Sequence, residues 1–175
     1  MSTHAYIAIK NEDGTITKIY NHFSGNFTNV GYKLYHFYKD VDKVKKLIDL
    51  GDISMLGQNP EPTEAVRRWG SDYRYNNEFK NSKFAKEYKT FYDSTIIEDV
   101  DYGKGTISYH RDGGEELRQR YLKSEQQFLK RLQDYDYGYV FKDGMWFGTG
   151  RCLNGAFVED TPLMYINECV YEDVE

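Results

Sequence analysis

The chain of 175 residues is poor in the residues that build metal sites and covalent cross-links. It has only two cysteines, Cys152 and Cys169, and four histidines. The cysteine spacing matches no metal motif such as C-x-x-C, and two thiols do not make a disulfide framework. We therefore expect two small buried thiols, scattered histidines of structural role, and no metal ion or other cofactor.

Long apolar runs are also missing. No stretch approaches the roughly 20 apolar residues that a membrane-spanning helix needs. The first five residues, Met1 to Ala5, lack the basic and apolar regions of a signal peptide. These absences predict a soluble, cytoplasmic protein with no membrane partner.

Positive charge is scarce in the C-terminal quarter. The whole chain carries a net charge of −5, and residues 132–175 hold two basic and nine acidic side chains. Nucleic-acid binding needs a basic patch that releases counterions, so this class of partner is not expected. The acidic quarter is either a solvated edge or a surface for a basic partner protein.

Aromatic residues, by contrast, are abundant. The chain has 17 tyrosines, 10 phenylalanines and 2 tryptophans. Tyrosine is flat and apolar on its faces and carries one polar tip. One core of this size cannot hide so many amphipathic rings, so some should line a pocket or an interface. The composition therefore predicts binding, and the excess of rings also favours a homodimer.

Alternating apolar residues predict strands on both sides of two tight turns. Residues 4–10 and 15–23 flank a turn at 11–14, and residues 137–142 and 145–149 flank Asp143-Gly144. Weaker patterns predict strands at 105–111 and 163–171. A chain of this length is one domain by default. We expect a single α+β domain over 1–175, with an antiparallel sheet built from two hairpins and helices packed on one face.

Helical spacing of apolar residues appears between these strands. It predicts a helix that follows Asn29 and carries Val30, Leu34 and Phe37, and a second helix over 40–50. It also predicts a short helix from Thr63 to Trp69, another over 83–92, and a long helix that Asp112 caps and that runs to Leu132. The region 58–95 as a whole is poorly patterned and reads as an insertion or a long loop.

The first candidate site is the end of the second predicted strand. Tyr20, His22, Ser24 and Gly25 lead there to a helix start near Asn29. A helix start offers unpaired N–H groups, which suit a phosphate or a carboxylate. An ordinary strand–helix connection with a surface histidine is the alternative interpretation.

The second candidate site is Tyr109-His110-Arg111, which precedes the helix cap Asp112. Arginine offers a planar fork for an anion, and histidine offers a proton that is exchanged near neutral pH. The alternative is a strand end that simply places polar residues in water. If the two strand ends share an edge of the sheet, both candidates face one pocket.

Catalytic motifs are absent from the sequence. His22-Phe23-Ser24 fits half of the paired H-x-[ST] pattern of two-histidine phosphoesterases, but no other histidine supplies the second half. No metalloprotease, nucleophile-elbow or calcium-loop motif occurs. We assign no catalytic residue, and a phosphoesterase that uses His22 and His110 stays open as an alternative.

Five blocks of sequence resemble a group of small, uncharacterised proteins of tailed phages. They are Ile7–Ile16, Ile19–Gly25, Lys43–Gly57, Tyr109–Glu116 and Gly138–Trp146. Small accessory proteins of phages often disarm host defences or redirect host enzymes. The resemblance thus implies a role against host defence, in the cytoplasm of an infected bacterium.

These observations together lead to two expectations for function. The favoured one is non-catalytic binding that sequesters a small nucleotide-type signal in an aromatic pocket, because two exposed rings would stack on a base. The alternative is a protein that binds and inhibits a host enzyme through the acidic quarter or a tyrosine surface.

Overall fold

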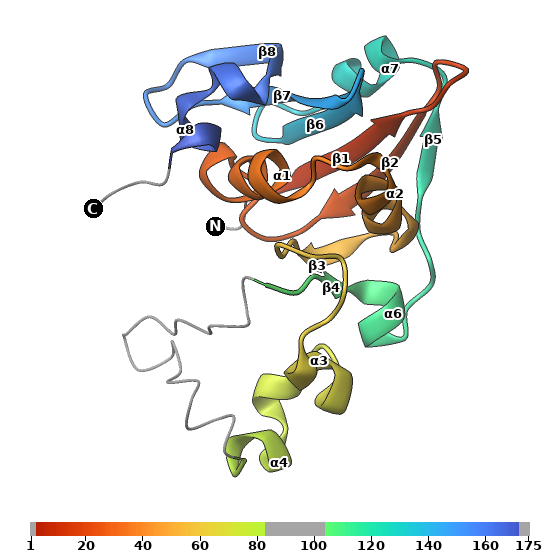
Figure 1. Ribbon diagram of the computed structural model, residues 1–175, viewed down its shortest axis with the longest axis vertical. Coiled ribbons are helices and arrows are strands. Elements are labelled where there is room, and N and C mark those ends of the chain that lie inside the picture. The colour runs from red at the N-terminus through yellow and green to blue at the C-terminus, as the bar shows by residue number, and fades with distance from the viewer. Residues whose placement is uncertain (1–2, 83–103, 172–175) are drawn as a thin grey trace.

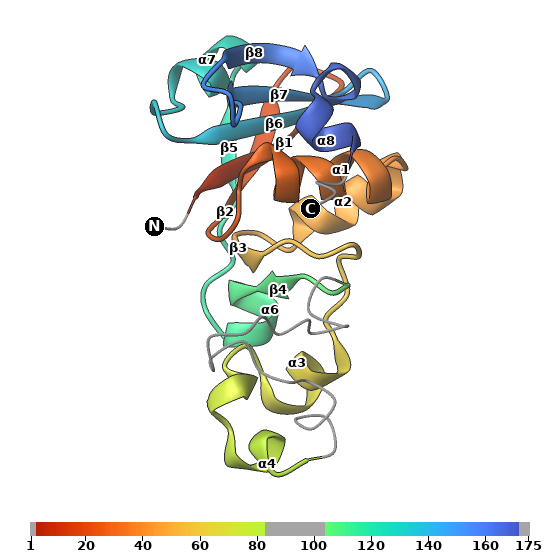
Figure 2. The same ribbon diagram turned by 90° about the vertical axis from the view of Figure 1, so that its left-hand side faces the viewer.

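The computed structural model describes residues 3–82 and 104–171, which form one eight-stranded sheet with helices around it (Figures 1 and 2). The strand order is β4-β3-β2-β1-β6-β7-β8, and β5 pairs with β2 beside β3. The strands are β1 (Ala5–Lys10), β2 (Ile16–Asn21), β3 (Ile53–Met55), β4 (Ile107–Ser108), β5 (Arg120–Leu122), β6 (Tyr137–Lys142), β7 (Met145–Arg151) and β8 (Phe157–Pro162).

The sheet is mixed, which corrects the expectation of an antiparallel one. The pairs β1–β2 and β6–β7 are antiparallel, but β1 and β6 run parallel, with Ala5 opposite Tyr137. Strands β2 and β3 are also parallel. Parallel neighbours need a crossover connection, and the chain between β2 and β3 supplies one as helices. Their bounds are η1 (Phe27–Gly31, a π-helix), α1 (Tyr32–Phe37) and α2 (Val41–Asp49).

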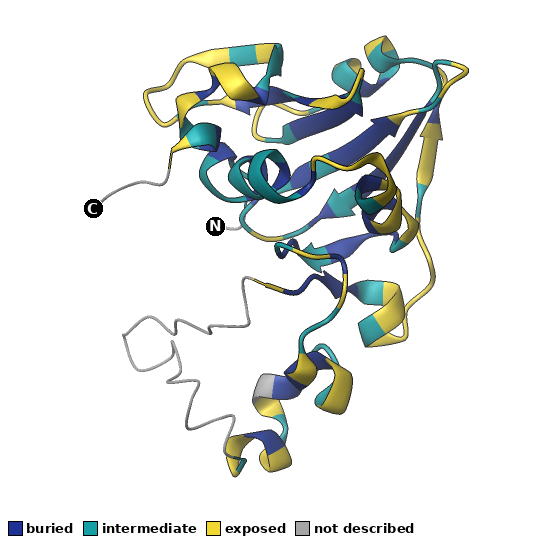
Figure 3. Cartoon of the chain, viewed as in Figure 1, coloured by how far each residue is buried: buried dark blue, intermediate teal, exposed yellow. Residues whose placement is uncertain are grey.

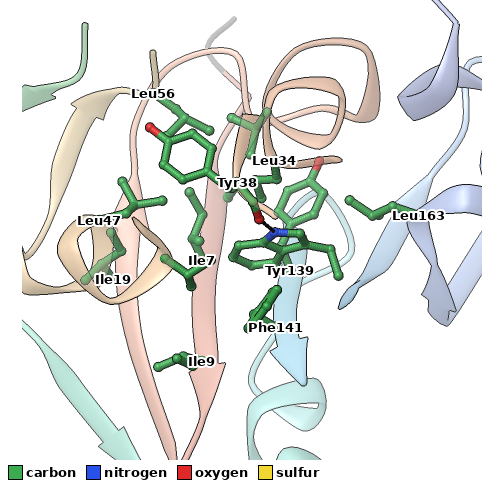
Figure 4. Close-up of a cluster of buried hydrophobic side chains, with 14 of the residues drawn as sticks. Ile7, Ile9, Ile19, Leu34, Tyr38, Leu47, Leu56, Tyr139, Phe141 and Leu163 are labelled. Carbon is green, nitrogen blue, oxygen red and sulfur yellow. Dashed lines mark hydrogen bonds between the residues drawn. The ribbon is translucent and has the colours of Figure 1, made fainter. Parts of the chain in front are cut away.

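These three helices cover one face of the sheet and bury the main core with it. The core joins strand residues such as Ile7 and Ile19 to Leu34, Tyr38 and other helix residues (Figure 4). The indole Nε1 of Trp146 donates a hydrogen bond to the main-chain oxygen of Tyr38, 2.8 Å away. Part of the aromatic surplus is therefore interior packing.

The opposite face carries a second, smaller cluster, so helices do not pack on one face only. Phe128 of α7 (Glu125–Lys130) packs there against the far sides of the strands, through Ala8, Ile16, Leu122 and Val140. Side chains alternate between the two faces along each strand. As a result, Tyr6, Lys18 and Tyr20 belong to this second face, while Ile7 and Ile19 belong to the first.

Two of the shorter predicted helices agree with the structure. The predicted helix over 40–50 is confirmed as α2, and the carboxylate of Asp40 caps it by accepting from the main-chain N–H groups of Asp42 and Lys43. The predicted helix from Thr63 is confirmed as α3 (Glu64–Trp69), with the Thr63 hydroxyl bound to the N–H of Val66. Both caps use the side-chain acceptors that helix starts favour.

The long helix predicted from Asp112 to Leu132 is wrong. Helix α6 (Tyr109–Gly113) stops at Gly114, which takes the left-handed conformation at φ 69°. An extended segment and β5 follow, and α7 begins only after its own cap, Ser124. The strand predicted over 105–111 is correspondingly short, since Tyr109 already starts α6.

The C-terminal prediction is also wrong. Residues 163–171 were expected to add an edge strand, but they form η3 (Leu163–Tyr165) and α8 (Asn167–Val170). Leu163, Ile166 and Cys169 point into the main core from these turns. The edge strand is β8, immediately before them.

The poorly patterned region builds a small outlying body below the sheet (Figures 1 and 3). Residues 64–80 form α3, η2 (Tyr73–Tyr75) and α4 (Asn77–Lys80), whose surfaces are largely exposed. They have their own cluster of Ala65, Val66, Tyr73, Phe79 and Ile107. The helix predicted over 83–92 lies outside the described residues.

Candidate functional site

A pocket of about 300 Å³ opens where the end of β2 meets α6. Tyr20 of β2 and Tyr109 of α6 both line it, so the structure brings one residue of each predicted site together. The other lining residues are Asp52, Glu115, Glu116 and Arg118. We call it the Tyr20–Tyr109 pocket.

Asp52, which precedes β3, holds the walls of this pocket together. The residue is 7% exposed. One end of β2 pairs with β3 and the other end pairs with β5, and Asp52 lies beside β2 between these two ends. Its carboxylate accepts a hydrogen bond there from the Tyr20 N–H at 2.9 Å. The guanidinium of Arg120 in β5 binds both of its carboxylate oxygens, at 2.9 and 3.2 Å. Paired in this way, the carboxylate serves as a structural anchor as much as a lining group.

The main chain of Asp52 fixes two further walls. Its N–H donates to the carbonyl oxygen of Arg118 at 3.0 Å, and its carbonyl oxygen accepts from the N–H of Tyr109 at 3.2 Å. The extended segment after α6 is therefore tied to the start of β3. This tie brings Glu115, Glu116 and Arg118 to the mouth of the pocket, although the sequence placed them in a helix.

The Tyr20 hydroxyl is held by two histidines. His4 Nδ1 lies 2.9 Å from the main-chain oxygen of His22 and 2.8 Å from the Tyr20 hydroxyl oxygen. A carbonyl oxygen only accepts, so His4 Nδ1 carries a proton and shares it with both oxygens. The Tyr20 hydroxyl then donates to His22 Nδ1 at 2.9 Å. This chain of hydrogen bonds fixes the Tyr20 ring.

The electrostatics of this cluster favour neutral groups. Burial, followed by the nearby His4, lowers the pKa of His22 below its ordinary value. A neutral His22 is what accepts the hydrogen bond from Tyr20. Burial also raises the pKa of the phenols of Tyr20 and Tyr109. The pocket therefore presents two uncharged phenol rings at neutral pH.

Arg111 and His110 do not line the pocket. The guanidinium of Arg111 binds the carboxylate of Asp112 and the main-chain oxygens of Pro60 and Thr106, at 2.7–2.9 Å. It thus ties α6 to the loop before α3 and to β4. The ring of His110 bonds to the main-chain oxygen of Glu115 at 2.7 Å, which shapes the turn after α6. The guanidinium that does line the pocket belongs to Arg118.

Ser24, Gly25 and Asn29 are not lining residues either. Gly25 is buried: its N–H donates to the Thr3 oxygen at 2.8 Å, and its oxygen accepts from the Tyr139 hydroxyl at 2.8 Å. Asn29 lies within η1 instead of capping it, and its N–H donates to the Asn26 oxygen. The expected unpaired amides at this helix start are thus partly used inside the protein.

Gly25 has a packing role that can be measured. A Cβ at this position would stand 2.6 Å from the carbonyl carbon of His4. Gly25→Ala is expected to lower the free energy of unfolding by about 1–3 kcal/mol, as overpacking of a core does. The control is Gly113→Ala, whose new Cβ would make ordinary van der Waals contacts, 3.5 Å from the Ser71 hydroxyl oxygen and 3.9 Å from Glu115 Oε2. Chemical denaturation of both variants checks this, and equal stability of the two would contradict it.

Outside this pocket, the described part of the chain offers few groups that could bind a metal ion or react as a nucleophile. Within residues 3–82 and 104–171, no group of three or more His, Cys, Asp or Glu side chains is placed to hold a metal ion. Cys152 and Cys169 are both free, and burial raises the pKa of each thiol. No described helix combines the length and the apolar character needed to cross a membrane.

Sequence reasoning missed four of the six lining residues. Asp52 stands just after the Gly51 turn, where it reads as a solvated residue, and Glu115, Glu116 and Arg118 were placed on a helix that does not form. The glycine pair Gly113-Gly114 was the signal that could have ended that helix earlier.

Comparison with known proteins does not assign the chain to a family. No family model matches the chain, and neither curated proteins nor solved structures gave a match.

Proposed function

We propose that the protein is a non-catalytic binding protein that holds a small nucleotide-type ligand in the Tyr20–Tyr109 pocket. The observation that carries the proposal is the pair of phenol rings, from two distant parts of the chain, on one pocket. Stacking of a base on an aromatic ring contributes about 1–3 kcal/mol. The volume of about 300 Å³ lies at the small end of the range for ligand pockets and suits a mononucleotide.

The charges of the pocket narrow the class of ligand. Three carboxylates and one guanidinium line it, and Arg120 already pairs with one of the carboxylates, Asp52. Carboxylates accept hydrogen bonds from ribose hydroxyls and from the amino groups of bases. Glu115 and Glu116 would also repel a chain of phosphates. We therefore favour a nucleoside or a nucleotide with few phosphates over a nucleoside triphosphate.

Binding is favoured over a phosphoesterase reaction by the placement of the histidines. His110 bonds to the Glu115 oxygen, and neither His22 nor His110 lines the pocket. An acid–base pair must reach the reacting atoms. The resemblance to phage accessory proteins then gives the proposal a setting, in which sequestration of a nucleotide signal in an infected bacterium blunts a host defence.

Exposed apolar side chains in the C-terminal quarter support a second proposal, the inhibition of a host enzyme by direct contact. Leu153, Phe157 and Tyr165 are 71%, 55% and 73% exposed. Large exposed aromatic rings such as those of Phe157 and Tyr165 serve as anchors in interfaces. If the protein forms a complex with a host enzyme and binds no nucleotide, the second proposal is favoured over the first.

The test of the first proposal is a binding series. Calorimetry with adenosine, guanosine, AMP, cyclic AMP, ADP-ribose and ATP is expected to give saturable binding for at least one of the first five, and weaker binding of ATP. Tyr109→Ala is expected to weaken that binding by about tenfold or more, because it removes a stacking surface.

The matched control is Tyr121→Ala. Tyr121 is 71% exposed and does not line the pocket, so its loss removes a ring without touching the site. Its variant should bind as the unaltered protein does. An absence of binding across the whole series, or equal affinity of the Tyr109→Ala variant, would sink the proposal.

A further inference from the structure

Lys18 is a buried lysine on the same face of the sheet as Tyr20. It lies in β2 two residues before Tyr20, or about 7 Å along the strand. The residue is only 6% exposed. Its Nζ stands 4.3 Å from the centre of the Tyr6 ring and 6.0 Å from that of Phe128. The Tyr6 ring in turn lies 5.6 Å from the Tyr20 ring.

The ammonium group of Lys18 has no hydrogen-bond acceptor and no ion-pair partner in the described part of the chain. The other cations of the core region differ. Lys142, for example, binds Glu125 and Asp160, and Lys33 and Lys43 bind main-chain oxygens. A buried charge without a partner is costly, and a contact with an aromatic face offsets only part of that cost.

Positively charged side chains outnumber negatively charged ones around Lys18 on this face of the sheet. Burial, and then the nearby Arg120 and Arg131, lowers the pKa of Lys18, while Asp136 and Asp52 oppose the shift. One of these carboxylates, Asp52, is already occupied by Arg120. Within the described residues, an external anion would therefore meet two cations without a salt-bridge partner, Lys18 and Arg131, and one such carboxylate, Asp136.

The ammonium group can be reached from solvent. In the described residues, the fully enclosed side-chain N and O atoms that lack a partner are the amide oxygens of Asn21, Asn26 and Asn29. Lys18 Nζ also lacks a partner but does not belong to this enclosed set. Its stem is covered, and its charged end keeps a contact with water, as is usual for lysine.

We propose that Lys18 anchors a phosphate-binding subsite on the sheet face beside the Tyr20–Tyr109 pocket, with Tyr6 as its floor. The phosphate group comes either from free phosphate or from a nucleotide whose base lies in the pocket. The negative charge of a phosphate ion would offset the excess of one cation that Lys18 and Arg131 hold over Asp136, while Arg120 and Asp52 are paired with each other. The subsite does not depend on the nucleotide proposal, because inorganic phosphate alone is enough to occupy it.

The test is titration of the whole chain with inorganic phosphate, at constant ionic strength, followed by NMR of the lysine side chains. Saturable binding is expected, with a change in the Lys18 resonances. Lys18→Met keeps an unbranched apolar stem over Tyr6 and Phe128 but removes the charge. We expect this variant to bind phosphate about tenfold more weakly or not at all, because it removes a charge-assisted hydrogen bond to the ligand. The exposed Lys123→Met is the matched control and should bind normally.

A comparison of AMP with adenosine separates the two sources of phosphate. A preference for AMP that disappears in Lys18→Met identifies the nucleotide as the source, and phosphate binding with no preference for AMP identifies free phosphate. The Tyr109→Ala variant, which tests the pocket, should keep its affinity for inorganic phosphate. No saturable phosphate binding, or equal affinity of the Lys18→Met variant, overturns the subsite. Neither result depends on whether adenosine binds.

Discussion

Asp52→Ala is expected to lower the free energy of unfolding by about 3 kcal/mol, one of the largest effects of a single substitution outside the apolar core. The change leaves the Tyr20 N–H and the Arg120 guanidinium without their acceptor. Removing one member of a buried ion pair costs about 3–5 kcal/mol. The side chain of Arg120 is 43% exposed and can turn to water, which places the expected loss at the low end of that range.

The control is Asp52→Asn, which keeps an oxygen for the Tyr20 N–H and removes the charge. A loss of about 1–2 kcal/mol is expected for it, the range for a hydrogen bond weakened from charged to neutral. Urea denaturation of the two variants measures the difference. Equal stabilities would mean that the N–H contact is unimportant, and a loss below about 0.5 kcal/mol in Asp52→Ala would remove Asp52 as the anchor of the pocket.

Asp52→Ala should also weaken nucleotide binding in the proposed site, because the carboxylate of Asp52 positions Tyr20 and ties β2 to Arg120 of β5. The pocket is thus built by one residue that the sequence did not single out. A carboxylate in a short turn has no local pattern that distinguishes a structural anchor from a solvated side chain. Its role arises from strands β2 and β5, which lie far from it in the chain and close to it in the sheet.

Local signals predicted local structure well. The helix over 40–50 follows from Asp40 at its start and from an apolar stripe at Val44, Leu47 and Ile48, all three of which are buried. The strands β1, β2, β6 and β7 lie where alternation placed them. Each of these elements depends on a turn or a cap within a few residues of it.

Long-range pairing could not be predicted in the same way. The parallel pairing of β1 with β6 joins residues more than 130 positions apart, and no local turn sequence predicts it. The segment 114–119, which has no regular secondary structure, was mistaken for part of a helix because Leu117, Tyr121 and Leu122 happen to have helical spacing. In the structure Leu117 and Tyr121 are exposed while Leu122 is buried, as a strand edge allows. The prediction of the candidate site is incomplete for the same reason, because half of the residues that line the pocket come from that segment.

The second large effect concerns the dependence of stability on pH. Lys33 of α1 extends its ammonium group to the main-chain oxygen of Leu56, 2.9 Å away, just after β3. Burial lowers the pKa of Lys33 to about 8, from an ordinary value of 10.5. Between these two values the folded chain holds Lys33 neutral while the unfolded chain still binds its proton. The unfolded state therefore binds more protons, and stability rises with pH across this window.

The size of the effect follows from the pKa difference. The contribution of Lys33 is fully present above the unfolded pKa and is lost as the pH falls through the folded pKa, so it should grow by about 3 kcal/mol between about pH 7.5 and pH 10.5. The quantity to measure is the difference in unfolding free energy between the unaltered protein and Lys33→Met. Buried phenols such as Tyr38, whose pKa burial raises, titrate in both proteins and cancel in that difference.

Lys46→Met is the control for the loss of a lysine charge, because Lys46 is exposed on α2. At neutral pH the Lys33→Met variant should be as stable as the unaltered protein or more so, since it no longer buries a charge. At high pH the order should reverse, because neutral Lys33 keeps its hydrogen bond to Leu56 at no electrostatic cost and methionine cannot form it. A difference that stays constant from pH 7.5 to pH 10.5 would show that Lys33 reaches water in the folded chain. The loop after β3 would then be held by Lys43 and Tyr38, whose Nζ and hydroxyl bind the next two carbonyl oxygens, those of Gln58 and Gly57.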